Sequence, residues 1–566
     1  MGKSKQPSSS IPQKFGFATW SCYNFGLMSI LWTSPLGPVG LLLAGGLLLL
    51  LLQRQLSPRL QRVLPIGLVA VSMTGWLLLR LQPQGAGQWW LWQAPLGLES
   101  ALGLQWPGTV WLAGWLLFMV ALVALILPGW QPRPGFTPLA FWMPLLLASG
   151  LLVLSAATWS VLLASWLLML FMTGLLAGTP IENAARAWTF LLLSSLFLLA
   201  VPMFNGMDSF LATLDSDYLN LQAQLLLTLA AMIPLGLYPF HVWLTPETQR
   251  PRSIQLALHL IPALAAVHLL GRFELSLLGS LSWVSVGIAG LLGSALAAWA
   301  TQDAQRAWLY VFINRASWVM LALALSQESG AHRTLFPLAT LALIGMLWAL
   351  LSTRNAQSGV SWRNALLLFF LIGFPLTPGF SLNLALTQLA STVVSFPAWI
   401  LTLLAQTLLV AAILGGQAQH RETQQEDFLP AGSRMWLLTL VLAFTLWWGV
   451  FPDALAHTAG MMPAHAHASV GAQLQAINKL SGGLTLLLPL LMGWLLARAR
   501  NHLFAGQEVL QTKVAAIAEL DWLLRWSRNL FHYLAQALGF LSDILDGAGQ
   551  FGWVLLALLI LWLFQH

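Results

Sequence analysis

Long apolar runs separated by short polar connections fill most of this 566-residue chain. About sixteen runs are long enough, or nearly so, for a helix to cross the roughly 30 Å hydrocarbon core of a bilayer. They cover residues 35–53, 63–79, 109–127, 138–156, 158–178, 187–202, 221–237, 254–270, 281–300, 307–326, 335–351, 364–376, 396–415, 435–450, 480–497 and 551–564. The pattern predicts an all-α, polytopic membrane protein, because a helix satisfies its own backbone polar groups in lipid.

Two of the runs, the seventh and the twelfth, are interrupted near their ends. The interruptions hold Pro234 and Pro239 in the seventh run, and Pro375, Pro378 and Gly379 in the twelfth. Proline removes a backbone donor and glycine permits the resulting bend, so both helices are expected to be broken. Broken segments at matching positions of two halves predict an inverted-repeat transporter fold with its working site at the breaks. Ordinary proline kinks, which are common in membrane helices, are the alternative.

The predicted organisation follows from these breaks. A polar tail and lead-in (1–34) precedes three helices (35–137). Two five-helix repeats (138–271 and 281–416) follow, and then two further helices (434–497). Residues 498–550 are too polar to span, and their apolar side chains recur at helical spacing. We therefore expect an amphipathic segment lying on the membrane surface or along a neighbouring subunit, followed by an anchor helix at 551–566.

Composition agrees with the membrane assignment. The chain is 58% hydrophobic and only 8% charged, whereas a soluble domain carries about 25% charged residues. The single cysteine, Cys22, excludes an internal disulfide and any Cys-ligated cluster within the chain. Arginines gather in connections after odd-numbered runs. The positive-inside rule places these connections in the cytoplasm, although three lysines in the N-terminal tail point the other way.

Residues 239–244, Pro-Phe-His-Val-Trp-Leu, come directly after the first break and resemble a family signature. It belongs to the antiporter-like subunits of respiratory complex I, which share it with Mrp-type cation/proton antiporters and membrane-bound hydrogenases. Weaker resemblances occur at 166–169, 302–310 and 373–380. The resemblance covers roughly 138–415, and the segment order is most like that of the large distal subunit. It implies proton translocation along a mid-membrane row of ionisable residues.

That row is degenerate in this chain. The family's glutamate on the fifth helix aligns with Leu167, and its lysines on the seventh, eighth and twelfth helices align with Pro234, Leu264 and Asn383. Its histidine–lysine pair on the eleventh helix falls among Thr340, Ile344 and Gly345. None of these side chains titrates near neutral pH. The resemblance therefore implies a proton-pump scaffold whose own channel is impaired or rerouted.

Histidines are the candidates for a substitute path, because histidine titrates in the useful range. The proton-path candidates are His241, His259, His268, Asn383 and Tyr238. The nine-residue spacing of His259 and His268 points their side chains to opposite sides of a helix, so hydrogen-bonded packing histidines are the alternative interpretation. Asp303 and Arg306, at the start of the tenth segment, are candidates for a structural ion pair.

No metal or cofactor site is predicted. His457, His465 and His467 form a small cluster near Asp453, and three aspartates, Asp208, Asp215 and Asp217, share one connection. Both patterns are typical of solvated loops. No phosphate-binding loop, nucleophile elbow, haem motif or iron–sulfur motif is present, so the chain carries no redox centre.

The leading hypothesis is an antiporter-like membrane subunit of a complex-I-like, proton-translocating assembly. It would work with other membrane subunits in a bacterial inner membrane or an equivalent energy-converting membrane, without binding nucleic acid. The alternative is the membrane subunit of a transporter for a solute such as inorganic carbon. A catalytic oxidoreductase is not favoured, although a subunit of an NADH/quinone-type translocase remains open.

Overall fold

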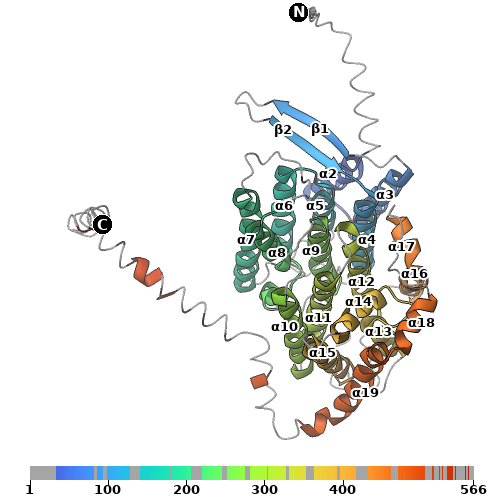
Figure 1. Ribbon diagram of the computed structural model, residues 1–566. Helices are drawn as coiled ribbons and strands as arrows, with labels where there is room; N and C mark the ends of the chain where they lie inside the picture. The colour runs from blue at the N-terminus through green and yellow to red at the C-terminus, as the bar shows by residue number, and fades with distance from the viewer. Residues whose placement is uncertain are drawn as a thin grey trace, which may run out of the picture.

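The computed structural model describes most of the chain between residues 34 and 503, together with scattered positions from 513 to 559. The gaps before 503 fall at 82–85, 94–98, 128–140, 178–180, 206–213, 215–218, 245–251, 274–280, 302–303, 327–329, 352–361, 392–394, 416–430 and 460–469. The described part is a helical bundle with one small hairpin (Figure 1).

Five segments form the first set. They are α5 (Met143–Ser155), α6 (Trp159–Ala177), α7 (Ile181–Phe204), α8 (Leu221–Met232) with the 3₁₀ turn η4 (Phe240–Trp243), and α9 (Arg252–Arg272). Helices α6, α7 and α8 lie side by side along one edge of the bundle (Figure 1). Two of these segments, α5 and α8, are shorter apolar helices.

Five segments also form the second set. They are α10 (Leu281–Ala300), α11 (Ala304–Leu325), α12 (Gly330–Leu351), α13 (Trp362–Ile372) with α14 (Gly379–Thr387) and η6 (Gln388–Ser391), and α15 (Phe396–Gly415). The fourth segment is the broken one in both sets, as the repeat prediction requires.

The remaining elements flank the two sets. They are α2 (Leu36–Leu52), α3 (Pro58–Leu78), η2 (Leu79–Leu81), α4 (Gly108–Ile126), α16 (Ala431–Val450), α17 (Pro452–Thr458), α18 (Val470–Asn478) and α19 (Leu480–Leu503). Strands β1 (Ala86–Gln93) and β2 (Glu99–Gln105) pair antiparallel and project from one end of the bundle (Figure 1). The sequence did not lead us to expect this hairpin.

Both breaks are built by the same backbone device. Gly236 has φ +68°, its N–H donates to the Ile233 carbonyl, and the next N–H donates to the Met232 carbonyl. Gly373 has φ +70° and makes the equivalent pair of bonds to the carbonyls of Phe370 and Phe369. These are Schellman motifs, in which a left-handed glycine ends a helix. The predicted breaks are therefore real helix ends and not proline kinks within continuous helices.

The two sets meet along α9 and α12, which pack against each other in the middle of the bundle. Glycines allow the close approach. A Cβ on Gly345 of α12 would lie 2.6 Å from a methyl of Leu260 on α9. A Cβ on Gly271 of α9 would likewise overlap Thr334 of α12. Because interiors are close-packed, these small residues fix how the halves sit together.

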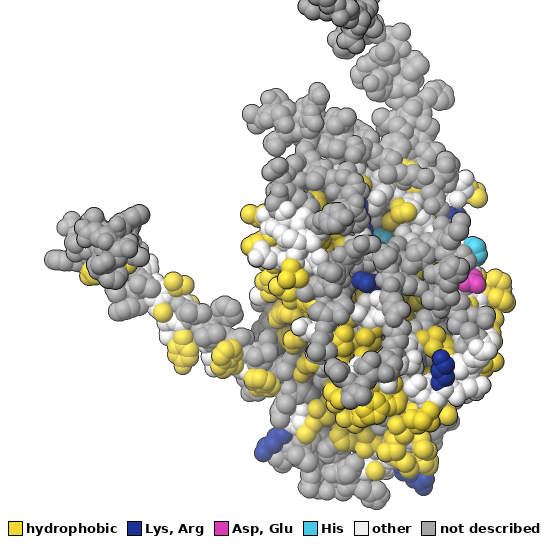
Figure 2. Space-filling view, in the orientation of Figure 1, with side chains coloured by type: hydrophobic (Ala, Val, Ile, Leu, Met, Phe, Trp, Pro, Cys, Tyr) yellow, Lys and Arg dark blue, Asp and Glu magenta, His cyan; other side chains and the backbone are white. Residues whose placement is uncertain are grey.

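The surface is that of a membrane protein. Apolar side chains dominate the coloured residues on the face shown in Figure 2, and charged ones are sparse. Within the described ranges, ten helices are long and apolar enough to cross a membrane, or eleven if α16 and α17 form one span bent by 105°. Three shorter apolar helices accompany them. The all-α, multi-pass prediction is confirmed, while the count of sixteen spans remains a prediction.

The C-terminal predictions fall largely outside the described residues. Helix α19 continues to Leu503, past the predicted start of the amphipathic segment. Six large aromatic or apolar side chains described farther on are exposed, namely Trp522, Trp526, Tyr533, Leu538, Leu555 and Leu559. The anchor helix at 551–566 stays a prediction, as do the predicted domain boundaries.

Candidate functional site

Aromatic rings pack against the histidine at the first break. The imidazole of His241 is 4% exposed and lies parallel to the Tyr238 ring, with centroids 4.9 Å apart and 9° between the planes. The imidazole also meets the ring of Tyr310 of α11 edge-on, with the centroids 5.7 Å apart. The helix ends at Gly236, and the residues after it, Tyr238 and His241, contact α10 and α11 of the second set. Tyr238 and His241, both predicted path residues, are therefore in contact.

Tyr238 rests on helix α10 of the second set. A Cβ on Gly293 would lie 2.7 Å from Cε1 and 2.8 Å from Cζ of the Tyr238 ring. One turn earlier on α10, a Cβ on Gly290 would lie 2.7 Å from the Ser317 hydroxyl oxygen and 3.7 Å from the Tyr238 carbonyl oxygen. The two glycines thus let the first break approach α10 and α11 closely.

Polar groups continue between α10 and α11. The Ser294 hydroxyl donates to the Gly290 carbonyl at 2.5 Å. The Asn314 amide nitrogen donates to the Leu291 carbonyl at 2.8 Å and lies 3.2 Å from the Ser294 hydroxyl. All three side chains between these helices, Ser294, Asn314 and Ser317, are buried and hydrogen-bonded, as polar groups in an apolar interior must be.

Arg315 continues this polar row at the middle of α11. Its side chain is 1% exposed and lies near the midpoint of a 22-residue helix, roughly 15 Å from either end. The guanidinium donates from Nη1 to the Leu371 carbonyl at 2.5 Å. Its Nη2 donates to the oxygens of Asn314 and, at 2.9 Å, Gln406. The Arg315 guanidinium also lies over the Trp318 ring, 4.5 Å from its centroid.

The second break is held by side-chain donors. The Asn383 amide donates to the Ile372 carbonyl at 2.5 Å and to the Gly373 carbonyl at 2.9 Å. Together with Arg315, it satisfies the carbonyls at the C-terminal end of α13 that have no helical partner. This end of a helix carries partial negative charge and would attract a cation. Here the protein's own guanidinium and amide occupy it.

We call this row the polar seam. Its members run from the first break to the second and are Tyr238, His241, Tyr310, Ser317, Ser294, Asn314, Arg315, Gln406 and Asn383. The sequence ranges of α8 to α16 contain no Asp, Glu or Lys. Within the described part of the chain, no carboxylate forms an ion pair with Arg315. The seam therefore has one permanent positive charge, on Arg315, and one histidine, His241, while its serine, asparagine, glutamine and tyrosine side chains are neutral near pH 7.

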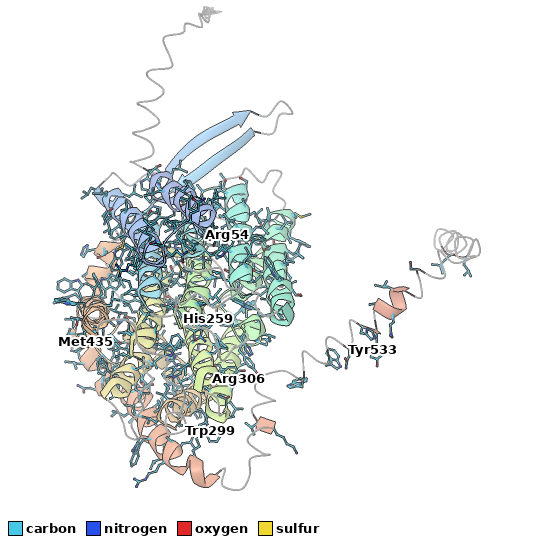
Figure 3. All side chains as sticks on the ribbon, turned by 180° about the vertical axis from the view of Figure 1, so that it is seen from behind. Arg54, His259, Trp299, Arg306, Met435 and Tyr533 are labelled. Carbon is cyan, nitrogen blue, oxygen red and sulfur yellow. The ribbon has the colours of Figure 1, made fainter. Side chains whose placement is uncertain are left out.

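The other two candidate histidines lie apart from the breaks, on α9. His259 is buried against Phe312, with ring centroids 5.1 Å apart, and lies near the middle of the bundle in the view of Figure 3. His268 is buried and hydrogen-bonded to the Leu154 backbone, one turn from Arg272. The two histidines contact different elements, which agrees with the opposite directions expected from their spacing.

The positions at which the family's ionisable residues are replaced lie in different environments. Leu167 is 49% exposed on the outer face of α6, beside Phe171 and Trp188 in an apolar groove. Leu264 is fully buried in α9. Thr340 is buried on α12, and its hydroxyl has no hydrogen-bond partner among the described residues.

The remaining polar candidates sit at helix ends. The Arg272 guanidinium donates to the Ala156 carbonyl. It also lies beside the Gln105 side-chain amide, whose oxygen accepts from it when the amide is turned so that the oxygen points toward Arg272. Arg272 therefore fastens the end of α9 to the hairpin strand β2. Arg306 is half-buried in the first turns of α11, near one end of the bundle (Figure 3), while Asp303 lies outside the described residues. The proposed ion pair between Asp303 and Arg306 stays a prediction.

No metal site is found within the ranges that the structure covers. No group of three or more His, Cys, Asp or Glu side chains there is placed to hold an ion. His457 and Asp453 lie on α17, whereas His465, His467 and the aspartates at 208, 215 and 217 fall in the gaps.

Sequence reasoning missed Arg315, the charged member of the seam. The signal was present, because a lone arginine stands in the middle of an apolar run beside Asn314. Charged residues at such depth are costly and usually functional. Its neighbours Leu371 and Gln406 lie 56 and 91 residues away, so their contact could not be read from spacing.

Comparison with solved structures places the fold. A chain in the structure of the Mrp complex from Dietzia sp. DQ12-45-1b superposes with a TM-score of 0.67 at 16% identity, over 92% of this chain and 62% of that one. This protein thus spans less than two thirds of the Mrp chain. A chain of respiratory complex I from Thermus thermophilus with bound aureothin matches with a TM-score of 0.56 at 19% identity, over 73% of this chain and 97% of that one.

At these identities the likeness establishes the fold and not the activity. No protein-family model matches the sequence, and no curated protein matches it significantly. The prediction that the chain has the architecture of complex I and Mrp membrane subunits is confirmed at the level of fold.

Proposed function

We propose that this chain is an antiporter-like membrane subunit of a complex-I-like, proton-translocating assembly, and that it supports its neighbours without carrying protons itself. The fold supports membership of a multi-subunit membrane complex. The observation that carries the second part is the position of Arg315, whose guanidinium occupies the carbonyl end of the broken helix α13.

The chemistry of the polar seam supports a non-conducting role. A proton relay needs a continuous row of buried groups that change charge. In the seam only His241 is of a residue type that titrates near neutral pH, whereas serine, asparagine and glutamine do not titrate and arginine stays protonated. The carbonyl ends of broken helices hold the coupling cation in many transporters. In this chain a fixed cation fills that place, and its charge repels an entering proton or metal cation.

Proton flux tests the proposal. The purified chain in liposomes containing a pH-sensitive dye is expected to show no flux above protein-free vesicles, while vesicles that also contain its partner subunits are expected to acidify. His241→Ala is expected to leave the flux of the assembly unchanged, like His457→Ala, which alters an exposed histidine. Robust flux through the isolated chain that disappears in His241→Ala or His259→Ala, but not in His457→Ala, would contradict the proposal.

A second candidate function is the membrane subunit of a solute transporter, with inorganic carbon as one candidate cargo. It is favoured by the neutral polar groups at the second break, where Thr377 and Asn383 are buried, and by the uncompensated charge of Arg315. Co-purification separates the two functions. Redox subunits in the isolated complex favour the first, and a zinc-bearing, carbon-hydrating partner favours the second.

A further inference from the structure

Three buried donors around Arg315 have no acceptor. They are Nε of Arg315 itself, Nε2 of Gln406 and the indole Nε1 of Trp318, all without a hydrogen bond among the described residues. The side-chain oxygen of Gln406 accepts a hydrogen bond from Arg315, and the Arg315 guanidinium lies over the Trp318 ring. The three unpaired groups thus belong to one cluster on α11 and α15.

Every acceptor already bound to Arg315 is neutral. The guanidinium is met by one backbone carbonyl, from Leu371, and by two amide oxygens, from Asn314 and Gln406. The end of α13 offsets part of the charge, because a helix C-terminus is worth about half an elementary charge. A buried cation without a full counter-charge is strongly disfavoured, as are unpaired buried donors. The cluster lacks an acceptor that carries negative charge.

A carboxylate of a neighbouring subunit is a poor candidate for that acceptor. Arg315 is 1% exposed, and it is enclosed by α13, α15 and Trp318 of its own chain. A side chain from outside would have to cross these helices to reach Nε. A small diffusible ion meets no such limit, since buried small molecules exchange through ordinary fluctuations of helices.

We propose that the cluster of Arg315, Gln406 and Trp318 binds a small monovalent inorganic anion, such as chloride, nitrate or bicarbonate. The ion accepts from Arg315 Nε and is joined by the Gln406 amide and the Trp318 indole. It lies beside the second break, because the Arg315 guanidinium donates to the Leu371 carbonyl at the end of α13. The proposed anion site does not depend on whether the chain moves protons. If no anion binds there, the proposed function still stands.

Binding is measured on the full chain in lipid nanodiscs. Radiolabelled chloride is titrated at constant ionic strength, with gluconate as the replacing anion, and is competed with nitrate and bicarbonate. One saturable site per chain is expected. Arg315→Gln is expected to weaken it at least about tenfold, because charge-assisted hydrogen bonds are the strong ones. Trp318→Phe, which keeps an aromatic ring and removes the indole donor, is expected to weaken it several-fold.

The matched control is Arg498→Gln. Arg498 also lies over a tryptophan ring, that of Trp494 at 5.6 Å, but on an exposed part of α19. The control removes the same charge and is expected to leave binding unchanged. If Arg315→Gln does not fold, Trp318→Phe still reports on the site.

A bromide-exchanged crystal distinguishes an ion from water. An anomalous bromine peak beside Arg315 Nε supports the site. Density there that does not change with the anion identifies a water molecule and overturns the proposal. So does the absence of saturable binding to the folded protein, or equal loss of binding in Arg498→Gln.

Discussion

Gly236 and Gly373 end the two broken helices with the same backbone geometry, at φ +68° and +70°. The two residues lie in different five-helix sets, and each closes a Schellman motif. The segments after the two glycines differ. The first break continues into the 3₁₀ turn that holds His241, and the second into α14, which holds Asn383. The same helix-ending motif thus presents different side chains to the seam.

Gly373→Ala is expected to destabilise the protein by about 2 kcal/mol or more. A left-handed conformation costs an L-residue roughly 1–2 kcal/mol. In addition, the new Cβ would lie 2.7 Å from the Gly379 carbonyl oxygen and 2.7 Å from the Trp318 ring. Thermal unfolding in nanodiscs measures the effect. The control is Gly67→Ala, at an exposed helical glycine with nothing within 4 Å of its Cβ position, which is expected to be neutral or slightly stabilising. Equal melting temperatures for the two variants would contradict the assigned break.

Gly293→Ala tests the contact between the first break and α10. The added methyl overlaps the Tyr238 ring, so a loss of roughly 1–3 kcal/mol is expected, as for other overpacked sites. Tyr238→Ala removes the ring and should remove most of this penalty. A double-mutant cycle in the melting transition checks it, with an expected coupling on the order of 1 kcal/mol. Additive effects of the two changes would show that the ring does not rest on Gly293.

Ser194→Ala tests how three helices of the first set are joined. The Ser194 hydroxyl accepts from the Trp166 indole at 3.2 Å and donates to the Ala230 carbonyl at 2.7 Å, linking α6, α7 and α8. Removing it leaves two buried groups unpaired, at a cost of roughly 1–3 kcal/mol. Among the described residues, the neighbouring Ser195 bonds within its own helix, to the Leu191 carbonyl. Ser195→Ala is therefore the control, and it is expected to have little effect. The link is disproved if the two serine variants unfold at the same temperature.

Asn383→Ala tests whether this position has become structural. Its amide is the side-chain donor to the carbonyls of Ile372 and Gly373, so its loss is expected to cost roughly 1–3 kcal/mol. Thr439→Ala, at an exposed hydroxyl bonded within α16, is the control. Hydrogen exchange of α13 and α14 measures the local effect. Faster exchange confined to these helices is expected, and unchanged exchange would mean that Asn383 does not hold the break.

The sequence by itself determined the class of the protein, most helix positions and the two breaks. These features are local. The length of an apolar run decides whether a helix can span the membrane, and proline and glycine change the backbone of the residues beside them. The helix at 281–300 was predicted to the residue, and α15 likewise. The loss of titratable side chains from the candidate row could also be read directly, at Leu167, Leu264 and Asn383.

Only the tertiary structure decided which polar residues meet. It brought Arg315 to Leu371 and Gln406, placed Tyr238 on Gly293, and turned Leu167 to the outer face. It also paired β1 with β2. Such contacts join helices that are far apart in sequence. They depend on how the glycine-lined helices pack and on how each helix is rotated about its own axis. No local pattern encodes that rotation, so the charged centre of the seam became visible only in the folded chain.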